Sequence, residues 1–238
     1  MDFRTLAKRI VMTLLALLIL PYLLIPVYAL PFIRPVSTLM LADLVTLQGY
    51  DRRWVPLEDI SPRLVQSVMM SEDGQFCFHG GVDWNQMQSV VSNALDGAAT
   101  RGASTIPMQT AKNLFLWNGR SFVRKGLEAY FTVLLELTWP KQRILEVYMN
   151  VAQFGDGIHG VGAASNTFFH GLPAQLSLAQ AARLAAVLPS PDRFHVDRPS
   201  GYVLERARWI EQQVRQLGGP AYLQSRQPPR DVRPARRR

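Results

Sequence analysis

The stretch SEDGQFCFHGGVDW, Ser71–Trp84, places two adjacent acids, Glu72 and Asp73, directly before a glycine-containing turn. It follows the apolar segment SPRLVQSVMM, in which Ser61 is a suitable N-cap and Pro62 takes the first helical position. The two acids therefore stand at the C-terminal end of a predicted helix, where negative charge opposes the helix dipole. A sequence that accepts this local cost favours a functional site, and solvated surface acids are the alternative.

Six further segments carry apolar residues at helical spacing and are bounded by capping or breaking residues. Ser104 and Ser177 are expected to cap two of them, and Pro140 is expected to separate two others. Only residues 47–57, LQGYDRRWVPL, suggest extended structure. The chain is therefore predicted to be mainly α, with further helices over residues 83–95, 104–116, 121–139, 141–154, 177–188 and 204–218.

The run from Ile10 to Ile33 contains no charged residue and is long enough to cross a bilayer, which needs about 20 apolar residues. Pro21 and Pro26 are tolerated in membrane helices. A cleaved signal peptide is the alternative, but its apolar core usually spans about 7–15 residues and ends at a small-residue site that is not clear here. We therefore expect an uncleaved N-terminal transmembrane helix over residues 10–33.

The residues before this run predict its orientation. Three basic residues stand against one acid, so the N-terminus is expected in the cytoplasm and the rest of the chain outside it: Arg4, Lys8 and Arg9 against Asp2. The predicted organisation is a cytoplasmic segment over 1–9, the anchor over 10–33, one folded domain over 34–220 and a basic Pro/Arg-rich tail over 221–238. The composition of the tail is typical of disordered segments.

The net charge of +8 is concentrated at the two ends of the chain. Arg226–Arg238 contributes +5 and the first nine residues contribute +2, which leaves +1 for the body. Binding to nucleic acid is therefore not supported. Cys77 is the only cysteine, so an internal disulfide is excluded, and the four histidines have no metal-ligand spacing. The sequence predicts no metal site.

A second polar cluster lies at the start of a predicted helix, in GASTIPMQTAKN over residues 102–113. Lys112 follows Gln109 by three residues and therefore shares its helical face. A helix N-terminus together with a lysine is suited to phosphate oxygens, and a capped surface helix is the alternative. The polar residues of this cluster are Ser104, Thr105, Gln109, Lys112 and Asn113.

A third cluster, VRKGLEA, places Arg124 and Glu128 four residues apart, with Lys125 beside them. An exposed ion pair of this kind would contribute only roughly a few tenths of a kcal/mol. The helix is apolar on most of its surface, so we expect it to be buried, and its charges must then face partners or a polar cleft. The later stretch ILEVYMNVAQFGDGIHGVGAAS, residues 144–165, is glycine-rich and is expected to be structural.

In their order along the chain, these stretches resemble the motifs of the family-51 glycosyltransferases, the peptidoglycan glycan polymerases of bacterial cell walls. EDGQFCFHGGVDW is similar to the first motif, GASTIPMQTAKN to the second and RKGLEA to the third. KQRILEVYMNVAQFGDGIHGVGAAS is similar to the fourth motif and ARLAAVLPSPDRF to the fifth. The likeness covers residues 50–200 and implies that the domain over 34–220 is a lysozyme-like glycosyltransferase domain. One anchor and one domain resemble the monofunctional biosynthetic form, which has no transpeptidase activity.

The resemblance also implies roles for individual residues. Glu72 matches the catalytic base of the family, Glu128 its second catalytic glutamate, and Asp73 a supporting neighbour in the site. Pro107 and Met108 depart from the second motif, where the family commonly has Thr or Ser and then Gln. The other matches are to substrate-binding positions: Lys112, Arg124 and Lys125 as the cations of the pyrophosphate site, with Ser104, Thr105, Gln109 and Asn113.

The implied reaction joins lipid II disaccharide units by β-1,4 linkage. Glu72 would take the proton from the acceptor 4-hydroxyl as this attacks the anomeric carbon of the donor with inversion. The cations would stabilise the undecaprenyl pyrophosphate that leaves. The sequence requires no cofactor, although Mg²⁺ or Mn²⁺ could assist. The expected partners are lipid II, the growing glycan chain and the membrane, with cell-wall synthesis or division proteins as further candidates. The expected location is the inner membrane, single-pass, with the catalytic domain on the periplasmic side.

Two other functions stay open at this point. A lysozyme-like lytic glycosidase would protonate the leaving oxygen with a carboxylic acid and would have no use for a cluster of cations. A non-catalytic, membrane-anchored cell-wall scaffold would recruit partners through its helices or tail and would not depend on Glu72.

Overall fold

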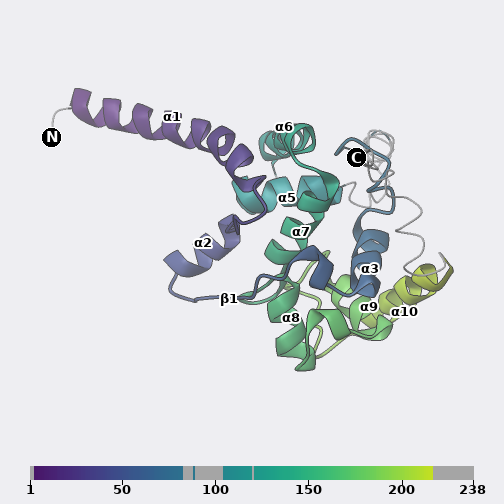
Figure 1. Cartoon of the computed structure of the whole chain (residues 1–238). Helices are drawn as coiled ribbons and strands as arrows, with labels where there is room; N and C mark the ends of the chain where they lie inside the picture. Colours follow the sequence, from purple (N-terminus) through teal and green to yellow (C-terminus); the bar gives the residue numbers. More distant parts are fainter. Residues whose placement is uncertain (1–2, 83–87, 89–103, 120, 217–238) are drawn as a thin grey trace, which may run out of the picture.

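The computed structural model describes residues 3–82, 88, 104–119 and 121–216, and this part of the chain is mainly helical (Figure 1). The predicted fold class is therefore confirmed at this level. The helix expected over 83–95 and the tail over 221–238 lie outside the described residues. The described helices are α1 (Phe3–Tyr28), α2 (Thr38–Val45), η1 (Leu57–Asp59), α3 (Pro62–Glu72), α5 (Ile106–Phe115), α6 (Phe122–Thr138), α7 (Lys141–Val151), α8 (Gly160–Phe169), η2 (Pro173–Gln175), α9 (Leu178–Val187) and α10 (Gly201–Gln216).

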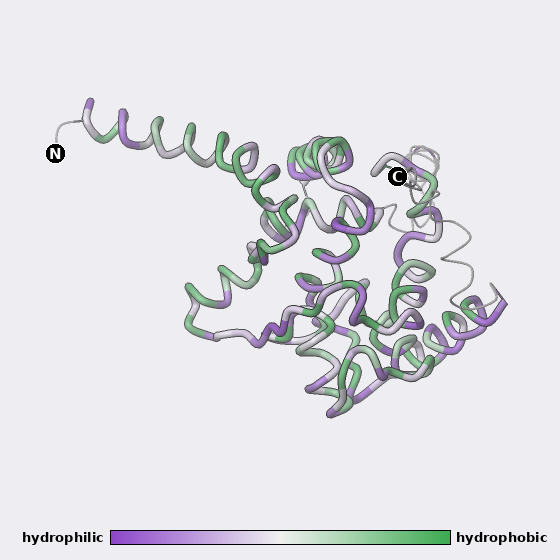
Figure 2. Tube along the Cα trace, in the orientation of Figure 1, coloured by the Kyte–Doolittle hydropathy of each residue, from purple (hydrophilic) through white to green (hydrophobic). Residues whose placement is uncertain are grey.

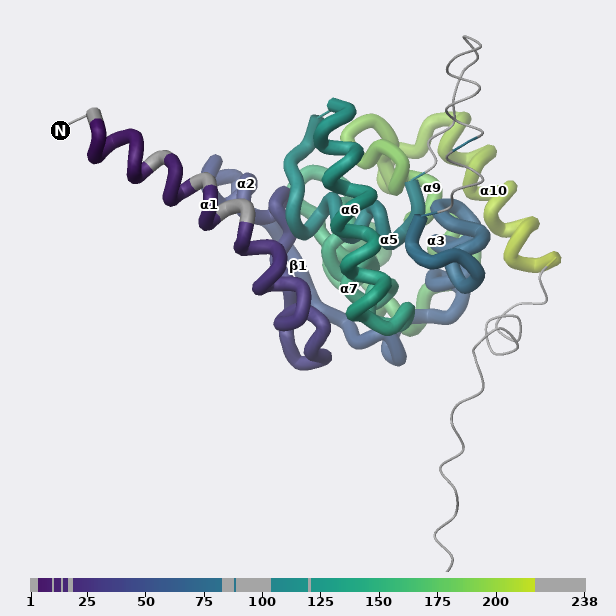
Figure 3. The backbone as a smooth tube through the Cα atoms, turned by 90° about the horizontal axis from the view of Figure 1, so that it is seen from above, coloured from purple at the N-terminus to yellow at the C-terminus, as the bar shows by residue number. Residues whose placement is uncertain are grey.

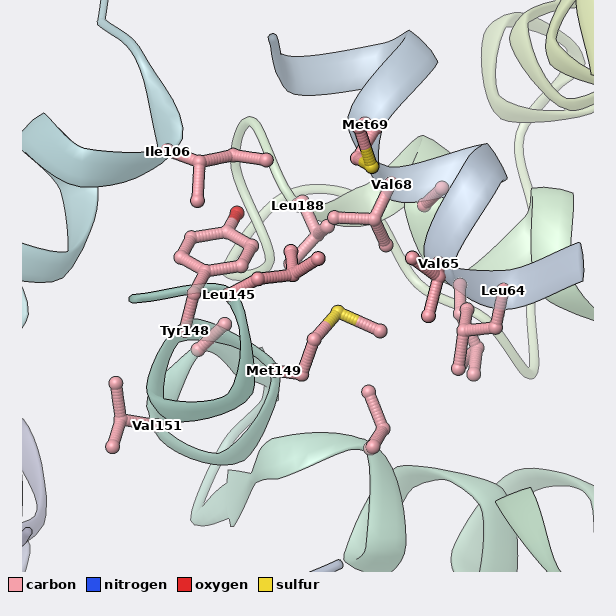
Figure 4. Close-up of a cluster of buried hydrophobic side chains, with 14 of the residues drawn as sticks. Leu64, Val65, Val68, Met69, Ile106, Leu145, Tyr148, Met149, Val151 and Leu188 are labelled. Atoms are coloured by element: carbon pink, nitrogen blue, oxygen red, sulfur yellow. The ribbon is translucent and has the colours of Figure 1, made fainter. Parts of the chain in front are cut away.

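The core is built around α7, which is buried along most of its length and packs against α5 and α8. Apolar side chains of α3 meet those of α7 in the centre of the molecule (Figure 4). Leu64 and Val68 of α3 and Met149 of α7 are fully buried, and burial of each such side chain contributes about 1.5–3 kcal/mol. On the other side α3 packs against α9 and α10, so the end of α3 is held between two helical layers (Figure 3).

Local capping decides where α5 and α9 begin. Ser177 and Gln180 form a capping box at the start of α9, as the predicted cap requires. At the start of α5 the expected cap, Ser104, is wrong by one position. Thr105 has extended backbone angles and its hydroxyl accepts a hydrogen bond from Met108 N, so Thr105 is the cap. Ser104 is thereby free to contact other groups.

A small sheet closes one side of the domain. Its strands are β1 (Asp51–Arg52), β2 (Gln153–Gly155) and β3 (Ile158–His159), in the order β1-β3-β2, with β1 parallel and β2 antiparallel to β3. Within the extended structure expected over 47–57, β1 covers only Asp51–Arg52, and Leu57 begins η1 instead. The elements β2, β3 and α8 were not predicted. Gly162 allows α8 to lie on the chain before α3, because a Cβ there would collide with the carbonyl oxygen of Arg53.

The N-terminal helix α1 extends away from the body of the molecule (Figures 1 and 3), and hydrophobic residues run along it after its first turns (Figure 2). Its C-terminal part docks on the body, where Trp139 Nε1 donates to the Ile25 carbonyl at 2.8 Å and Tyr22 and Tyr130 share a hydrogen bond of 3.0 Å. In the part of the chain that the structure describes, no helix combines the length and apolar character needed to cross a membrane. The transmembrane helix over 10–33 therefore stays a prediction.

Candidate active site

A cleft of about 1070 Å³ opens where the end of α3 meets α5, α6 and α10. Most of the predicted site residues line it, although they come from three separate sequence clusters: Glu72, Asp73, Ser104, Gln109, Lys112, Arg124, Lys125 and Glu128. The opposite wall is formed by residues of α10 that the sequence did not single out, namely Tyr202, Glu205, Arg206 and Trp209. The sequence therefore predicted the residues of α3, α5 and α6 that line the cleft, but it did not predict those of α10.

Glu72 is the last residue of α3, and its side chain is only 7% exposed. Gln109 Nε2 donates to Glu72 Oε2 at 2.9 Å, and Ser71 Oγ donates to Glu72 Oε1 at 3.0 Å. Burial raises the pKa of the Glu72 carboxyl, and the hydrogen bonds from Gln109 and Ser71 oppose that rise. The charge of Asp73 adds to the rise to a smaller extent. A carboxylate with a raised pKa at a cleft is suited to accept a proton.

Tyr148 fixes the orientation of Gln109 and was missed by the sequence analysis. Its hydroxyl donates to Gln109 Oε1 at 3.1 Å, so the amide nitrogen of Gln109 is directed at Glu72. Figure 4 shows the Tyr148 ring on α7, with its hydroxyl oxygen pointing past Ile106 of α5. Burial raises the pKa of the Tyr148 phenol well above its usual value, so this group stays a donor. The available signal was a tyrosine among the apolar positions of its helix, since a buried hydroxyl usually has a partner.

Arg206 of α10 is the second residue that the sequence analysis missed. Its Nη2 donates to Ser71 Oγ at 2.9 Å and to the Ser71 carbonyl at 3.3 Å, and lies 3.6 Å from Glu72 Oε1. Its charge lowers the pKa of Glu72 and so works against burial. Arg206 Nε is buried without a hydrogen-bond partner among the described residues. No sequence motif connects Arg206 to Ser71, because the two residues meet only in the folded chain.

Asp73 has a different environment from its neighbour. Its side chain is 1% exposed, and its carboxylate accepts hydrogen bonds from His79 Nε2 at 2.8 and 3.0 Å and from Ile106 N at 3.0 Å. Gly81, at φ +90°, donates its N–H to His79 Nδ1. Asp73 thus fastens the glycine turn to the start of α5. Direct substrate binding by Asp73 stays a prediction.

Glu128 holds two of the predicted cations on the α6 side of the cleft. Its carboxylate is 2% exposed and accepts hydrogen bonds from Arg124 Nη1 at 2.6 Å and Lys125 Nζ at 2.7 Å. Lys125 Nζ also donates to Ser104 Oγ at 2.6 Å, and Arg124 Nε donates to the Gly119 carbonyl at 2.8 Å. Both cations are therefore fixed in place, as a receptor for an anion requires.

Lys112 of α5 completes the cation cluster. It lines the cleft, and among the described residues no group forms a hydrogen bond or ion pair with its ammonium. Burial lowers the pKa of Lys112, Glu128 raises it, and the charges of Arg124 and Lys125 lower it further. Three cations face the two carboxylates that act on Lys112, Glu128 and Glu72, so this side of the cleft is net positive and is suited to bind an anionic ligand.

Two predicted binding residues do not line the cleft. Thr105 caps α5 and donates to the Gly81 carbonyl at 2.5 Å. Asn113 is 7% exposed, and its main-chain carbonyl accepts a hydrogen bond from the Thr38 hydroxyl at 3.2 Å. Pro107 and Met108, the two departures from the second motif, are buried on α5 and also do not line the cleft. The part of the chain that the structure describes holds no group of three or more His, Cys, Asp or Glu side chains placed to bind a metal.

Comparison with known proteins agrees with this geometry. The family model described as Transglycosylase matches residues 40–215. The chain belongs to the transglycosylase family. The membership predicted from the ordered motifs is therefore confirmed.

Relatives of high identity include the biosynthetic peptidoglycan transglycosylase of Agrobacterium fabrum, which is 72% identical over 219 residues and aligns with 92% of this chain and 97% of that protein. The protein of the same name from Rhizobium meliloti is 55% identical over 217 residues, covering 91% of this chain and 92% of its own. That of Xanthomonas campestris pv. campestris is 49% identical over 198 residues, covering 80% of each.

Proposed function

We propose that this transglycosylase is a monofunctional peptidoglycan glycosyltransferase that polymerises glycan chains from lipid II. The observation that carries the proposal is the position of Glu72, a buried carboxylate with a raised pKa that shares one cleft with three cations. The family match and the names of the relatives support the activity class. The geometry supports Glu72 as the base and the three cations as the groups that bind the pyrophosphate.

In the reaction that we propose, the 4-hydroxyl oxygen of an acceptor sugar attacks the anomeric carbon of the donor. A new carbon–oxygen bond forms as the bond to the pyrophosphate breaks, the proton passes to Glu72, and undecaprenyl pyrophosphate leaves with the electron pair. Negative charge develops on the leaving oxygens, and Lys112, Arg124 and Lys125 are placed to stabilise it. Attack from the side opposite the leaving group inverts the anomeric carbon and gives a β-1,4 linkage.

The raised pKa of Glu72 fits a general base. A carboxylate with an ordinary pKa has little affinity for a proton near neutral pH, so burial improves its ability to accept one in the transition state. The hydrogen bond from Gln109 and the nearby charge of Arg206 limit the rise in the pKa of Glu72. Burial thus makes Glu72 more basic than an exposed glutamate, while these two groups favour its ionised form.

For Glu128 we propose an indirect part in catalysis. Both of its oxygens already accept hydrogen bonds from cations, and its carboxylate is 2% exposed, so it is poorly placed to take a proton from substrate. By holding Arg124 and Lys125, it would position the charges that meet the pyrophosphate. This is a positioning role rather than that of a second base.

We also propose that the N-terminal segment anchors the enzyme at the membrane in which its lipid substrate is confined. The run over 10–33 carries no charge, and α1 extends away from the catalytic domain (Figure 1). Basic residues before the run favour a cytoplasmic N-terminus and a catalytic domain, 34–220, on the periplasmic side. Highly exposed apolar side chains on α2 and α6, among them Val45 and Phe122, are suited to contact the bilayer surface.

The lytic glycosidase is the enzyme that this proposal must exclude. Paired carboxylates that act in glycosidic cleavage need one of the two free to protonate the leaving oxygen, whereas Glu128 is bound by two cations. Incubation of the full-length protein with labelled lipid II tests the proposal. Growth of glycan chains supports it, and cleavage of preformed glycan without growth contradicts it. Parallel reactions with Mg²⁺, with Mn²⁺ and with a chelator test whether a divalent ion assists.

A further inference from the structure

Apart from Arg206, whose charge lowers the pKa of Glu72, the α10 wall of the cleft has no part in the chemistry proposed above. Tyr202, Glu205, Arg206 and Trp209 follow one another at spacings of three, one and three residues, so they share one face of the helix. The opposite face of α10 packs into the core through Val203, Ala207, Ile210 and Val214. Figure 2 shows this alternation of hydrophilic and hydrophobic residues along α10. Packing of α10 therefore does not explain the residues on its cleft face.

The two aromatic residues of this face are highly exposed to solvent. Tyr202 is 54% exposed and Trp209 is 47% exposed, although both line a cleft. Phe194 lies against Tyr202 with ring centroids 5.1 Å apart, which limits the orientations of the Tyr202 ring. Large exposed aromatic side chains at a concave site indicate a binding surface more often than a structural one.

The polar residues between the two rings also lack full partners. Arg206 Nε is buried with no hydrogen-bond partner in the described part of the chain, although Nη2 of the same side chain is bonded to Ser71. Glu205 is exposed and, among the described residues, forms no hydrogen bond or ion pair. The Arg206 side chain is 23% exposed, so a ligand in the cleft would find part of its guanidinium and the carboxylate of Glu205, flanked by two aromatic rings.

This combination matches a carbohydrate. A hexose has an apolar face of C–H groups, which lies well on an aromatic ring, and a rim of hydroxyl groups, which needs polar partners. Tyr202 and Trp209 are seven residues apart, which places them about 10 Å apart along the helix axis, comparable with the length of a disaccharide. A polyprenyl tail would instead require a continuous apolar surface, which the charges of Glu205 and Arg206 interrupt.

The position of the cations indicates which sugar lies on this wall. Lys112, Arg124 and Lys125 belong to α5 and α6, on the side of Glu72 that meets Gln109, whereas α10 lies on the side that meets Arg206. Because an inverting attack approaches opposite the leaving group, the acceptor must come from the side away from the cations. That side is the α10 wall.

We infer that Tyr202 and Trp209 form a sugar-binding surface for the acceptor disaccharide, with Arg206 and Glu205 bonding its polar substituents. The inference rests on the proposed function, because it assumes a glycan acceptor and a pyrophosphate donor. In this arrangement the rings hold the acceptor in register with Glu72, and they take no part in bond breaking.

Steady-state kinetics of the full-length protein on lipid II test this inference. Trp209→Ala and Tyr202→Ala are each expected to raise KM by about two- to tenfold, the range for loss of one aromatic contact, with kcat within about twofold of the wild type. Trp209→Phe keeps a ring and should restore most of the loss. Arg208→Ala changes an exposed neighbour on α10 that does not line this cleft and should leave KM unchanged. Thermal unfolding of each variant checks that the fold is intact.

A lipid II analogue with a shortened prenyl chain separates sugar binding from tail binding. If the wall binds sugar, the ratio of variant to wild-type KM is the same for the short and the long substrate. An unchanged KM in both alanine variants, an equal change in Arg208→Ala, or an effect that disappears with the short tail would overturn the inference. A wild-type protein that fails to polymerise lipid II would instead contradict the proposed function.

Discussion

Replacement of Tyr148 by phenylalanine removes one hydroxyl that has no direct contact with substrate in our account. The hydroxyl donates to Gln109 Oε1 at 3.1 Å, and this bond directs the Gln109 amide nitrogen to Glu72. Without it the amide can rotate, and Glu72 loses a donor that lowers its pKa. A neutral hydrogen bond of this kind contributes a net ~1 kcal/mol, which is about fivefold in an equilibrium.

The sign of the pH effect follows from the role of Glu72 as a base. Glu72 acts only when ionised, so activity rises as the pH passes upward through its pKa. In Tyr148→Phe that pKa is higher still, and the acidic limb of the kcat/KM profile should move to higher pH. At a pH on that limb, activity should be about fivefold below wild type, and at higher pH the two profiles should converge.

Tyr130→Phe is the matched control, because Tyr22 is the only described residue that its hydroxyl bonds and Tyr130 does not line the cleft. It should leave the profile unchanged. Polymerisation rates on lipid II, measured across the pH range for the three proteins, provide the comparison. An acidic limb in Tyr148→Phe that coincides with the wild type, or a uniform loss at every pH, would refute the linkage through Gln109.

Two further predictions concern the cations and the turn. Lys112→Ala should reduce turnover at low lipid II concentration by about tenfold or more, because it removes a charged donor to phosphate worth ~1.5–3 kcal/mol; turnover equal to wild type would show that the pyrophosphate does not meet this residue. Gly81→Ala should lower the free energy of unfolding by roughly 1–3 kcal/mol, because φ is +90° and a Cβ would collide with Glu136. Denaturant unfolding measures the free energy of unfolding of Gly81→Ala. An unaltered midpoint and slope would contradict the predicted strain at Gly81.

Short-range signals predicted most of the helices. Proline and capping residues set the limits of α3, α6 and α9 closely, because these signals act over a few residues. Ser104 and Thr105 are both acceptable caps by residue type, and only tertiary contacts decide between them: Thr105 also bonds Gly81, whereas Ser104 bonds Lys125. The strands β2 and β3 have three and two residues and are too short to carry a pattern of their own.

The candidate site was predicted on one wall only. Glu72 and the cations stood out because charged residues interrupt apolar helical segments, which is visible in the sequence. Tyr148 and Arg206 did not, since their contacts with Gln109 and Ser71 join segments far apart in the chain. Sequence spacing indicated the pairing of Glu128 with Arg124, whereas the bonds of Lys125 to Glu128 and to Ser104 came from the fold.

The central claim is that Glu72 accepts the proton of the acceptor hydroxyl, and Glu72→Gln tests it most directly. Glutamine keeps the shape of the side chain but cannot act as a base, while Lys112 and the other cations stay in place to bind substrate. The account predicts that the rate of lipid II polymerisation by full-length Glu72→Gln falls by about 10²–10⁴-fold with the fold unchanged. Chain growth at the wild-type rate would contradict it.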